Sequence, residues 1–346
     1  MVPENSVLSS TYNPLPEPGA PELSVAAEVA TSPSIDAQPV WSVLDVAAIA
    51  FFTFCNLLVF TFIAITVAAA IPGLRGLQTS QLANMPLVLL PPEVLAYFAM
   101  LRFMAKLIRR KGGGSLLRAV QWRFPREIAL YGIIGILLAL FIVSASRLLP
   151  MPKSLPIDEI FHDRLSAYLM MAFGVTLAPF FEELFFRGFL YPALARMKGR
   201  GWFWMTTLLL LWPAWLLVLL AIRKLGFAQI HIHARLLDFY ISLGISVALI
   251  ALSGVLAFRT RVLESYSTPL SLVATAGCFA LIHGEQLGHA WAPLFVIFVV
   301  GLVLTAVRVR SQSVGASFIV HSFYNATLFV TIFVATNGFR NFDKIG

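Results

Sequence analysis

Long apolar runs recur along the chain from Trp41 almost to the C-terminus, separated by short polar links. A run of about 20 apolar residues is long enough to cross a hydrocarbon core about 30 Å thick. Nine runs qualify, and they lie near residues 43–71, 86–108, 127–149, 166–196, 202–222, 237–258, 267–287, 290–308 and 312–336. The second run is the weakest, because Pro91, Pro92 and Glu93 interrupt it. The pattern predicts an all-α fold, a polytopic bundle of about nine transmembrane helices, with eight as the lower count.

Composition places these runs in a membrane. The 346 residues are 59% hydrophobic and 12% charged, with a mean hydropathy of +0.83, whereas soluble domains carry about 25% charged residues. The net charge of +8 comes from Lys and Arg residues that cluster at the ends of apolar runs, where they can anchor helices at lipid headgroups. We therefore expect an integral, multi-pass membrane protein whose partner is the lipid bilayer, and no nucleic acid partner.

The chain divides by composition into four parts. Residues 1–40 hold seven prolines, five acidic residues and no Lys or Arg, which is typical of a disordered tail. N-terminal transmembrane helices are expected over 41–115, a helical core over 116–336 and a short tail over 337–346. Most Lys and Arg residues lie in the links after the second, fourth, sixth and eighth runs or at the ends of these runs, as do Arg102 and Lys106. The positive-inside rule then makes that side cytoplasmic, together with the N-terminal tail, and in a bacterium the membrane would be the plasma membrane.

Three short motifs carry most of the ionisable side chains that fall well inside apolar runs. They are EELFFR (Glu182, Glu183 and Arg187), FALIH (Phe279 to His283) and HSFYN (His321 to Asn325). A charge at the bilayer centre costs roughly 2.5 to 3.5 kcal/mol, so function is the first explanation for such residues. On a helix Glu183 and Arg187 share one face, four residues apart, whereas Glu182 is turned about 100° away. Arg187 can therefore neutralise Glu183 and leave Glu182 free for chemistry.

The three motifs can meet inside the bilayer. At 1.5 Å of rise per residue from the cytoplasmic flank, Glu182, His283 and His321 lie roughly 21, 22 and 16 Å deep. Such a set supports attack of water on a carbonyl, with a glutamate as general base, one histidine sharing the proton, and a second histidine and an amide donating to the oxyanion. Glu182, His283 and His321 are equally the ligand set of a hydrolytic zinc site. The residues alone leave both chemistries open.

In this order on separate membrane helices, Glu-Glu-x-x-x-Arg, Phe-x-x-x-His and His-x-x-x-Asn resemble the CPBP, or Abi, family of intramembrane proteases, to which the CAAX prenyl endopeptidase belongs. The resemblance covers about Leu116 to Phe333. It implies an endopeptidase that acts on a membrane-associated peptide or protein, prenylated in the CAAX-type branch. The roles it implies are water activation by Glu182 with His321, oxyanion binding by His283 and Asn325, and structural support by Glu183, Arg187 and Phe279.

Family members are often labelled metalloproteases, and the resemblance to the prenyl endopeptidase branch favours a glutamate-based mechanism without a metal cofactor. A zinc ion on Glu182, His283 and His321 is the alternative. In that arrangement only Glu183 would remain as a base, and pairing with Arg187 would turn it away from the water. We therefore expect no metal, with zinc as the second choice.

The chain departs from the family pattern between the first and second motifs. About 60 residues intervene there, and they are expected to form an inserted helical hairpin at about 201–262. Two crossings return the chain to the same side, so the motif helices keep their relative orientation. His231 and His233, in the link between the inserted spans, are read as a solvated loop, and Glu285 and His289 as cavity rim or surface.

Two other classes of function remain open. Glu, Arg and His inside a membrane also build proton relays, so the chain could be a proton- or ion-coupled transporter, although no second copy of the Glu-Glu-x-x-x-Arg pattern is found. A catalytically silent scaffold or immunity protein with the same fold is the third class. Within the protease reading, the family offers two kinds of substrate, the C-terminus of a prenylated protein and a bacterial peptide.

Overall fold

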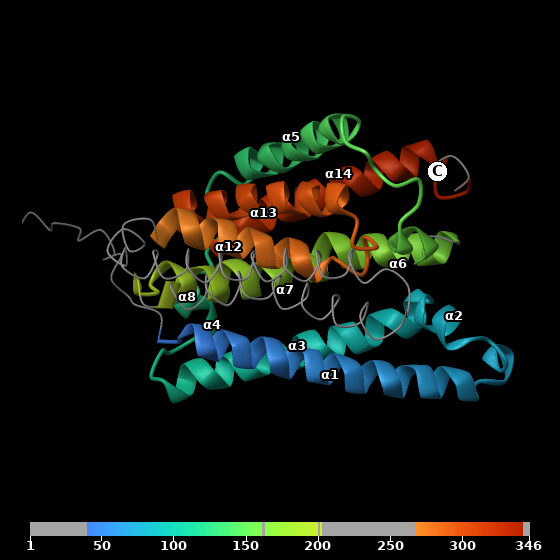
Figure 1. Ribbon diagram of the computed structural model, residues 1–346, viewed down its shortest axis with the longest axis horizontal. Helices are drawn as coiled ribbons and strands as arrows, with labels where there is room; N and C mark the ends of the chain where they lie inside the picture. The colour runs from blue at the N-terminus through green and yellow to red at the C-terminus, as the bar shows by residue number, and fades with distance from the viewer. Residues whose placement is uncertain (1–39, 161–162, 200, 203–266, 342–346) are drawn as a thin grey trace, which may run out of the picture. The chain divides into compact units, whose positions relative to one another are not determined.

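The computed structural model describes residues 40–160, 163–199, 201–202 and 267–341 (Figure 1). Contacts divide the chain into two units, Met1–Gln38 and Pro39–Gly346, and all described residues belong to the second. Their regular structure is helical without any strand, which confirms the predicted all-α class. The predicted tail 1–40 and the predicted hairpin 201–262 lie outside the described residues except for Val40, Gly201 and Trp202, so the division into domains stays a prediction.

The helices follow the predicted apolar runs closely. The elements are α1 Val43–Ala70, η1 Pro72–Leu74, α2 Thr79–Ala83, α3 Pro86–Arg110, α4 Leu116–Ala119, α5 Ile128–Ser146, η2 Pro156–Ile160, α6 Arg164–Ala172, η3 Phe173–Leu177, α7 Ala178–Glu183, η4 Leu184–Leu190, α8 Tyr191–Ala195, α12 Ser267–Ile282, α13 Trp291–Ser311 and α14 Val314–Ala335. Elements α6 to α8 form one long helix over Arg164–Ala195. α3 continues through Pro91 and Pro92, so the weakest predicted run is a full helix.

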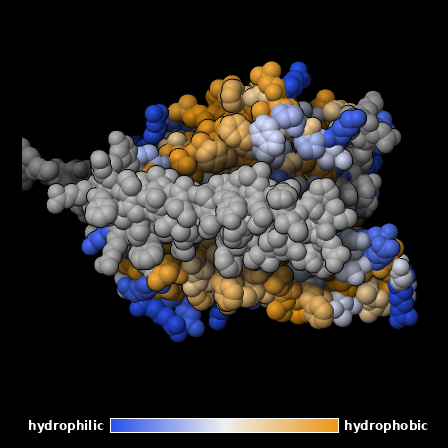
Figure 2. All heavy atoms as spheres, in the orientation of Figure 1, coloured by the Kyte–Doolittle hydropathy of each residue, from blue (hydrophilic) through white to orange (hydrophobic). Residues whose placement is uncertain are grey.

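Six of these helices are long and apolar enough to cross a membrane: α1, α3, α5, the long helix Arg164–Ala195, α13 and α14. α12 is a shorter apolar helix. Many large apolar side chains face outward, among them Phe51, Phe62 and Val67 of α1. Figure 2 shows hydrophobic residues along the flanks of the bundle and hydrophilic residues gathered near the helix ends. The chain is an integral, multi-pass membrane protein, as its composition predicts.

The helices pack in pairs (Figure 1). α1 lies antiparallel to α3 and α12 antiparallel to α13, whereas α5 and α14 run side by side in the same direction. α14 also contacts α7 and η4. At one end, Asp45 of α1 caps its own helix through Ser42 and forms an ion pair of 2.6 Å with Lys111, directly after α3. Trp41 stacks on Phe189 of η4 at a centroid distance of 4.5 Å, which ties α1 to the long helix.

Small residues allow α5 to approach α14 closely. A methyl group added at Gly135 would lie 2.9 Å from the Cβ atom of Phe323 and 3.0 Å from the backbone nitrogen of Tyr324. Because apolar side chains gain little from leaving lipid, close backbone approach is a main source of stability between membrane helices. Gly135 therefore positions α14, the helix that carries His321.

The long helix changes its winding twice. η3 and η4 are π-helical segments, one before and one after the two glutamates of α7. Such wide turns are frequent at functional sites. Carbonyls in both segments accept side-chain hydrogen bonds from other parts of the chain: Gly174 from Asn325 at 2.6 Å, Arg187 from Arg308 at 3.3 Å, and Phe189 from Trp41 at 3.0 Å. The segment that presents the glutamates is thus anchored on both sides.

One predicted boundary is wrong. The run near 267–287 was expected to be helical throughout, whereas α12 ends at Ile282. Turns follow, and Gly288 and His289 adopt positive φ values of 56° and 55°, which a right-handed helix does not allow. His283 consequently lies just beyond the helix end.

Candidate active site

The two adjacent glutamates have different surroundings. Glu183 is fully buried and forms an ion pair with the buried Arg187, with 2.9 Å between Oε1 and Nη1, as the four-residue spacing predicts. A second guanidinium nitrogen of Arg187 donates to the carbonyl of Gly301 in α13 at 3.1 Å. Glu182, the neighbour of Glu183, keeps 13% of its side chain exposed and lines a cavity.

Gly301 matters here because it has no side chain. A methyl group at this position would lie 3.1 Å from Ala276 and 3.2 Å from the ring of Phe279, closer than ordinary contact. The carbonyl of Gly301 also accepts from Thr305 at 2.7 Å. Nothing in the sequence distinguishes this glycine from others in apolar runs, so its part in holding Arg187 becomes visible only in the structure.

His321 joins the two glutamates. Its Nδ1 lies 3.0 Å from Oε1 of Glu183, and its Nε2 lies 3.8 Å from Oε2 of Glu182. A carboxylate held ionised by Arg187 can only accept, so the proton of the ring sits on Nδ1. In the neutral ring Nε2 therefore presents its lone pair towards Glu182. Glu183 thus orients His321 as the carboxylate of a catalytic triad orients its histidine.

Phe279 is the centre of the aromatic packing around these groups. Its ring lies under the guanidinium of Arg187 at 4.5 Å, within the range of cation–π attraction. The rings of His283 and His321 meet it edge-on, at centroid distances of 5.0 and 5.7 Å. Phe279 therefore spaces the two histidines and covers the buried cation, a physical reason for a phenylalanine in the second motif.

His283 has a defined proton position as well. Its Nδ1 lies 2.8 Å from the carbonyl of Phe279, and because a carbonyl can only accept, Nδ1 carries the proton. Nε2 of the neutral ring is then an acceptor. His283 can therefore donate to an oxyanion only in its doubly protonated form. The oxyanion role that the family resemblance implies for His283 requires this form.

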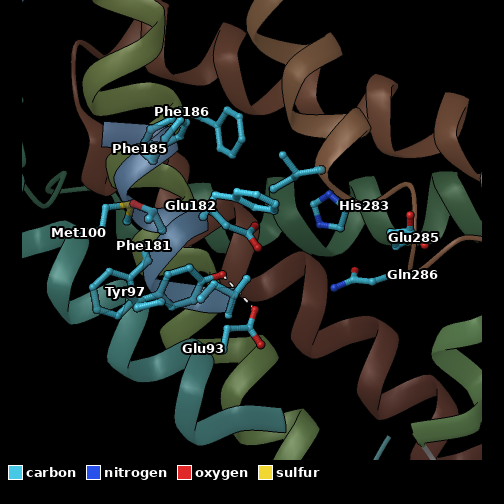
Figure 3. Close-up of a pocket in the computed structure, with 16 residues that line it drawn as sticks. Glu93, Tyr97, Met100, Phe181, Glu182, Phe185, Phe186, His283, Glu285 and Gln286 are labelled. Atoms are coloured by element: carbon cyan, nitrogen blue, oxygen red, sulfur yellow. Dashed lines mark hydrogen bonds between the residues drawn. The ribbon is translucent and has the colours of Figure 1, made fainter. Parts of the chain in front are cut away.

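A cavity of about 500 Å³ opens between α1, α3, the segment Phe181–Phe186 and the turn after α12. Most of its lining is apolar. In Figure 3 the carboxyl group of Glu182 and the ring of His283 point towards the same space from opposite sides. His321 and Asn325 do not belong to the lining. The cavity therefore brings Glu182 and His283 together, with His321 behind Glu182.

Asn325 lies one turn beyond His321 on α14. Its amide nitrogen donates to the carbonyl of Gly174 in the π-helical segment η3. This contact fixes the segment that leads to Glu182, a positioning effect that the sequence alone did not indicate. The expected oxyanion role of Asn325 stays a prediction.

No three side chains of His, Cys, Asp or Glu lie together as a metal site would require, within the part of the chain that the structure describes. Glu182 and His321 are neighbours, but the donors of Glu182, His283 and His321 are not gathered around one point. The present arrangement does not fit the alternative zinc site. His231 and His233 lie outside the described residues, and Glu285 and His289 form an exposed contact of 3.7 Å.

Two polar residues of α3 line the cavity although the sequence pattern did not predict them as part of the site. Glu93 of α3 lines it, and the hydroxyl of Tyr97 donates to Glu93 at 3.3 Å. Tyr97 stacks on Phe181, the residue before Glu182, at 4.8 Å. The signal was available, since a glutamate followed four residues later by a tyrosine stands inside an apolar run, but we read Glu93 only as an interruption.

Comparison with known proteins places these motifs in a family. The model of the family described as type II CAAX prenyl endopeptidase Rce1-like matches residues 164–263 and 254–327. The matched residues contain Glu182, Glu183, Arg187, Phe279, His283, His321 and Asn325. Comparisons with curated proteins and with solved structures gave no match. Residues 164–327, which carry all three motifs, match a family model of CAAX-type membrane proteases, and this match supports a place for the chain in the CPBP family.

Proposed function

We propose that the chain is an intramembrane endopeptidase that hydrolyses a peptide bond of a lipidated or membrane-associated protein, with Glu182 as general base. The match to the family model of CAAX prenyl endopeptidases supports the class of reaction. The observation that carries the assignment is the division between the glutamates. Glu183 forms an ion pair with Arg187 and contacts His321. Glu182 faces the cavity, and no Lys or Arg among the described residues is bound directly to it.

The mechanism follows from these positions. A water molecule beside Glu182 gives one proton to the carboxylate while its oxygen attacks the carbonyl carbon of the substrate. The protonated Glu182 can then donate to Nε2 of His321 once the 3.8 Å that separates them shortens to hydrogen-bond distance. When the tetrahedral intermediate collapses, the proton passes from Glu182 to the leaving amine, and the carboxylate is restored. Each turnover thus consumes one water molecule and needs no other reactant.

The surrounding residues supply orientation and charge stabilisation. Glu183 fixes the ring of His321, and Arg187 holds Glu183 ionised. His283, when doubly protonated, is placed across the cavity to donate to the oxyanion, and Asn325 is its predicted companion. No metal has a role in this scheme. The substrate class that we favour is a protein with a prenylated C-terminus, as in the CAAX branch.

The test compares purified wild-type protein with Glu182→Gln in proteoliposomes. The reporter is a farnesylated peptide with a CAAX-type C-terminus, and mass spectrometry locates any cut. We expect cleavage by the wild type and a loss of at least about 100-fold for Glu182→Gln, because general base catalysis contributes 10²–10⁴-fold. Glu127→Gln, the same change at an exposed residue before α5, serves as the matched control. Equal rates for Glu182→Gln and wild type would overturn the proposal.

If the farnesylated peptide is not cut, membrane peptides from cells that contain the wild type or Glu182→Gln are compared by proteomics. A product found only with the wild type identifies a different substrate. Absence of any difference, with both proteins present at equal amounts, would argue for a silent scaffold.

A further inference from the structure

Two carboxyl groups line the cavity besides that of Glu182. The side chain of Glu285 is almost fully exposed, whereas Glu93 is a partly buried group that neither the family match nor the mechanism uses. Glu93 lies on α3, outside the matched residues 164–327. It lines the same cavity as Glu182, and the negative charges of the two repel each other. A carboxylate inside a membrane helix costs roughly 2.5 to 3.5 kcal/mol, so it requires a compensating interaction.

The packing of α3 holds Glu93 in place. Tyr97 stacks on Phe181 at 4.8 Å and lies nearly parallel to Phe173 at 6.2 Å, which fixes its ring. Its hydroxyl then donates to Oε1 of Glu93 at 3.3 Å. Figure 3 shows the amide of Gln286 pointing into the same part of the cavity from the opposite side. Glu93 is thus a positioned group in a partly enclosed, mostly apolar space.

The charge of this space is unbalanced. None of the described residues that line the cavity is Lys or Arg. Arg187, the nearest buried cation of the motifs, is bound to Glu183 and Gly301. Glu93 has a hydroxyl as its hydrogen-bond donor and no cationic partner in the described part of the chain. In a low-dielectric cavity a carboxylate pair of this kind attracts a cation strongly.

We propose that Glu93, held by Tyr97, is a specificity-determining residue that binds a basic side chain, Lys or Arg, of the peptide substrate near the scissile bond. This assignment rests on the proposed endopeptidase function and names a class of substrate for its cavity. The basic side chain supplies the charge that the cavity lacks. Its aliphatic stem lies along the apolar lining, as stems of Lys and Arg do on apolar surfaces.

The cleavage test uses paired lipidated peptides that differ by lysine against norleucine at one position, moved in turn through the residues on both sides of the cut. Norleucine keeps the stem and removes the charge. At one position we expect the wild type to prefer lysine by at least about tenfold in kcat/KM. Glu93→Gln keeps the size of the side chain and a hydrogen-bond acceptor for Tyr97, and it should bring the ratio of kcat/KM for the lysine and norleucine peptides close to one. Tyr97→Phe keeps the stacked ring and should lower this ratio only partly.

A binding measurement separates this proposal from the proposed function. Fluorescent versions of the same two peptides are titrated onto Glu182→Gln, which should not cleave them, with and without Glu93→Gln. Tighter binding of the lysine peptide that disappears with Glu93→Gln supports the subsite even if no cleavage is ever found. Glu127→Gln is the control for loss of one negative charge and should leave the ratio as in the wild type.

Two results would overturn the proposal. One is the absence of a lysine preference at every position in both cleavage and binding. The other is an equal loss with Glu93→Gln for the lysine and norleucine peptides, which would show that Glu93 serves the reaction or the packing without recognising charge. An unaltered circular dichroism spectrum and melting temperature of Glu93→Gln in detergent are required for either conclusion.

Discussion

Two neighbouring glutamates with identical side chains have different surroundings. Glu183 contacts Arg187 and His321, while Glu182, the preceding residue on the helix, faces a cavity. The periodicity of a helix predicts this divergence, because adjacent side chains point about 100° apart. The contact of Glu183 with His321 could not be predicted from the sequence, because it depends on how α14 packs against α7.

The pair Glu182→Gln and Glu183→Gln should therefore behave differently. Glu182→Gln replaces a cavity-facing carboxylate and should lose activity while keeping the stability of the wild type. Glu183→Gln leaves Arg187 buried without its counter-charge, which costs about 3–5 kcal/mol, and also removes the orienting partner of His321. Thermal unfolding in detergent, together with the cleavage assay, checks both. Equal melting temperatures for the two variants would contradict this division.

Metal dependence gives a further prediction about the residues of the site. Because the donors of Glu182, His283 and His321 are not gathered around one point, we expect purified protein to hold far less than one transition metal per chain. Cleavage should persist after treatment with EDTA. Elemental analysis and activity before and after chelation provide the check. Stoichiometric zinc, with activity lost on removal and regained on addition, would make these three residues ligands instead.

At the scale of elements, the apolar pattern predicted the helices well because membrane helices must satisfy their backbone groups internally. The end of α12 was misplaced, since Gly284 and Gly288 inside an apolar stretch give only a weak stop signal. The two π-helical segments around the glutamates were not foreseen at all. They depend on tertiary hydrogen bonds such as that from Asn325 to Gly174, which join parts of the chain about 150 residues apart.

Gly135 and Gly277 offer a matched test of helix packing. A methyl group at Gly135 meets Phe323 and the backbone of α14, whereas one at Gly277 meets nothing within 4 Å. Gly135→Ala should therefore push α5 away from α14, cost about 1–3 kcal/mol and lower activity through His321. Gly277→Ala should be neutral or stabilising by up to about 1 kcal/mol, because alanine favours a helix. The melting temperatures of the two variants in detergent are the measurement. Equal melting temperatures would show that the close approach of α5 to α14 contributes nothing to stability.

At the scale of the whole membrane unit, basic residues are distributed unequally between the two helix ends. The end that contains the links 111–127 and 196–202 and the start of α14 carries more Lys and Arg than the end that contains 71–85, 147–163 and 283–290. Figure 1 shows α4 and α8 at the first end, and α2 and α6 at the other. Membrane helices that follow one another within residues 40–202 and within 267–341 alternate in direction between these ends, although the packed pair α5 and α14 runs the same way.

This asymmetry yields a prediction about orientation, with a consequence for substrate entry. By the positive-inside rule the end with α4 and α8 should face the cytoplasm. Glu93 lies roughly 10 Å from the start of α3, at the non-cytoplasmic end, and Glu182 lies roughly 20 Å from the end of α8, at the cytoplasmic end. The cavity would therefore sit in the non-cytoplasmic half of the membrane.

Single cysteines test this orientation. They are placed at the exposed Ser115 and Ser154, one at each end of the helices, in a background with Cys55 and Cys278 replaced by serine. A membrane-impermeant maleimide added outside intact cells should label Ser154→Cys and spare Ser115→Cys, while both react after permeabilisation. The reverse pattern would place the cavity in the cytoplasmic half of the membrane.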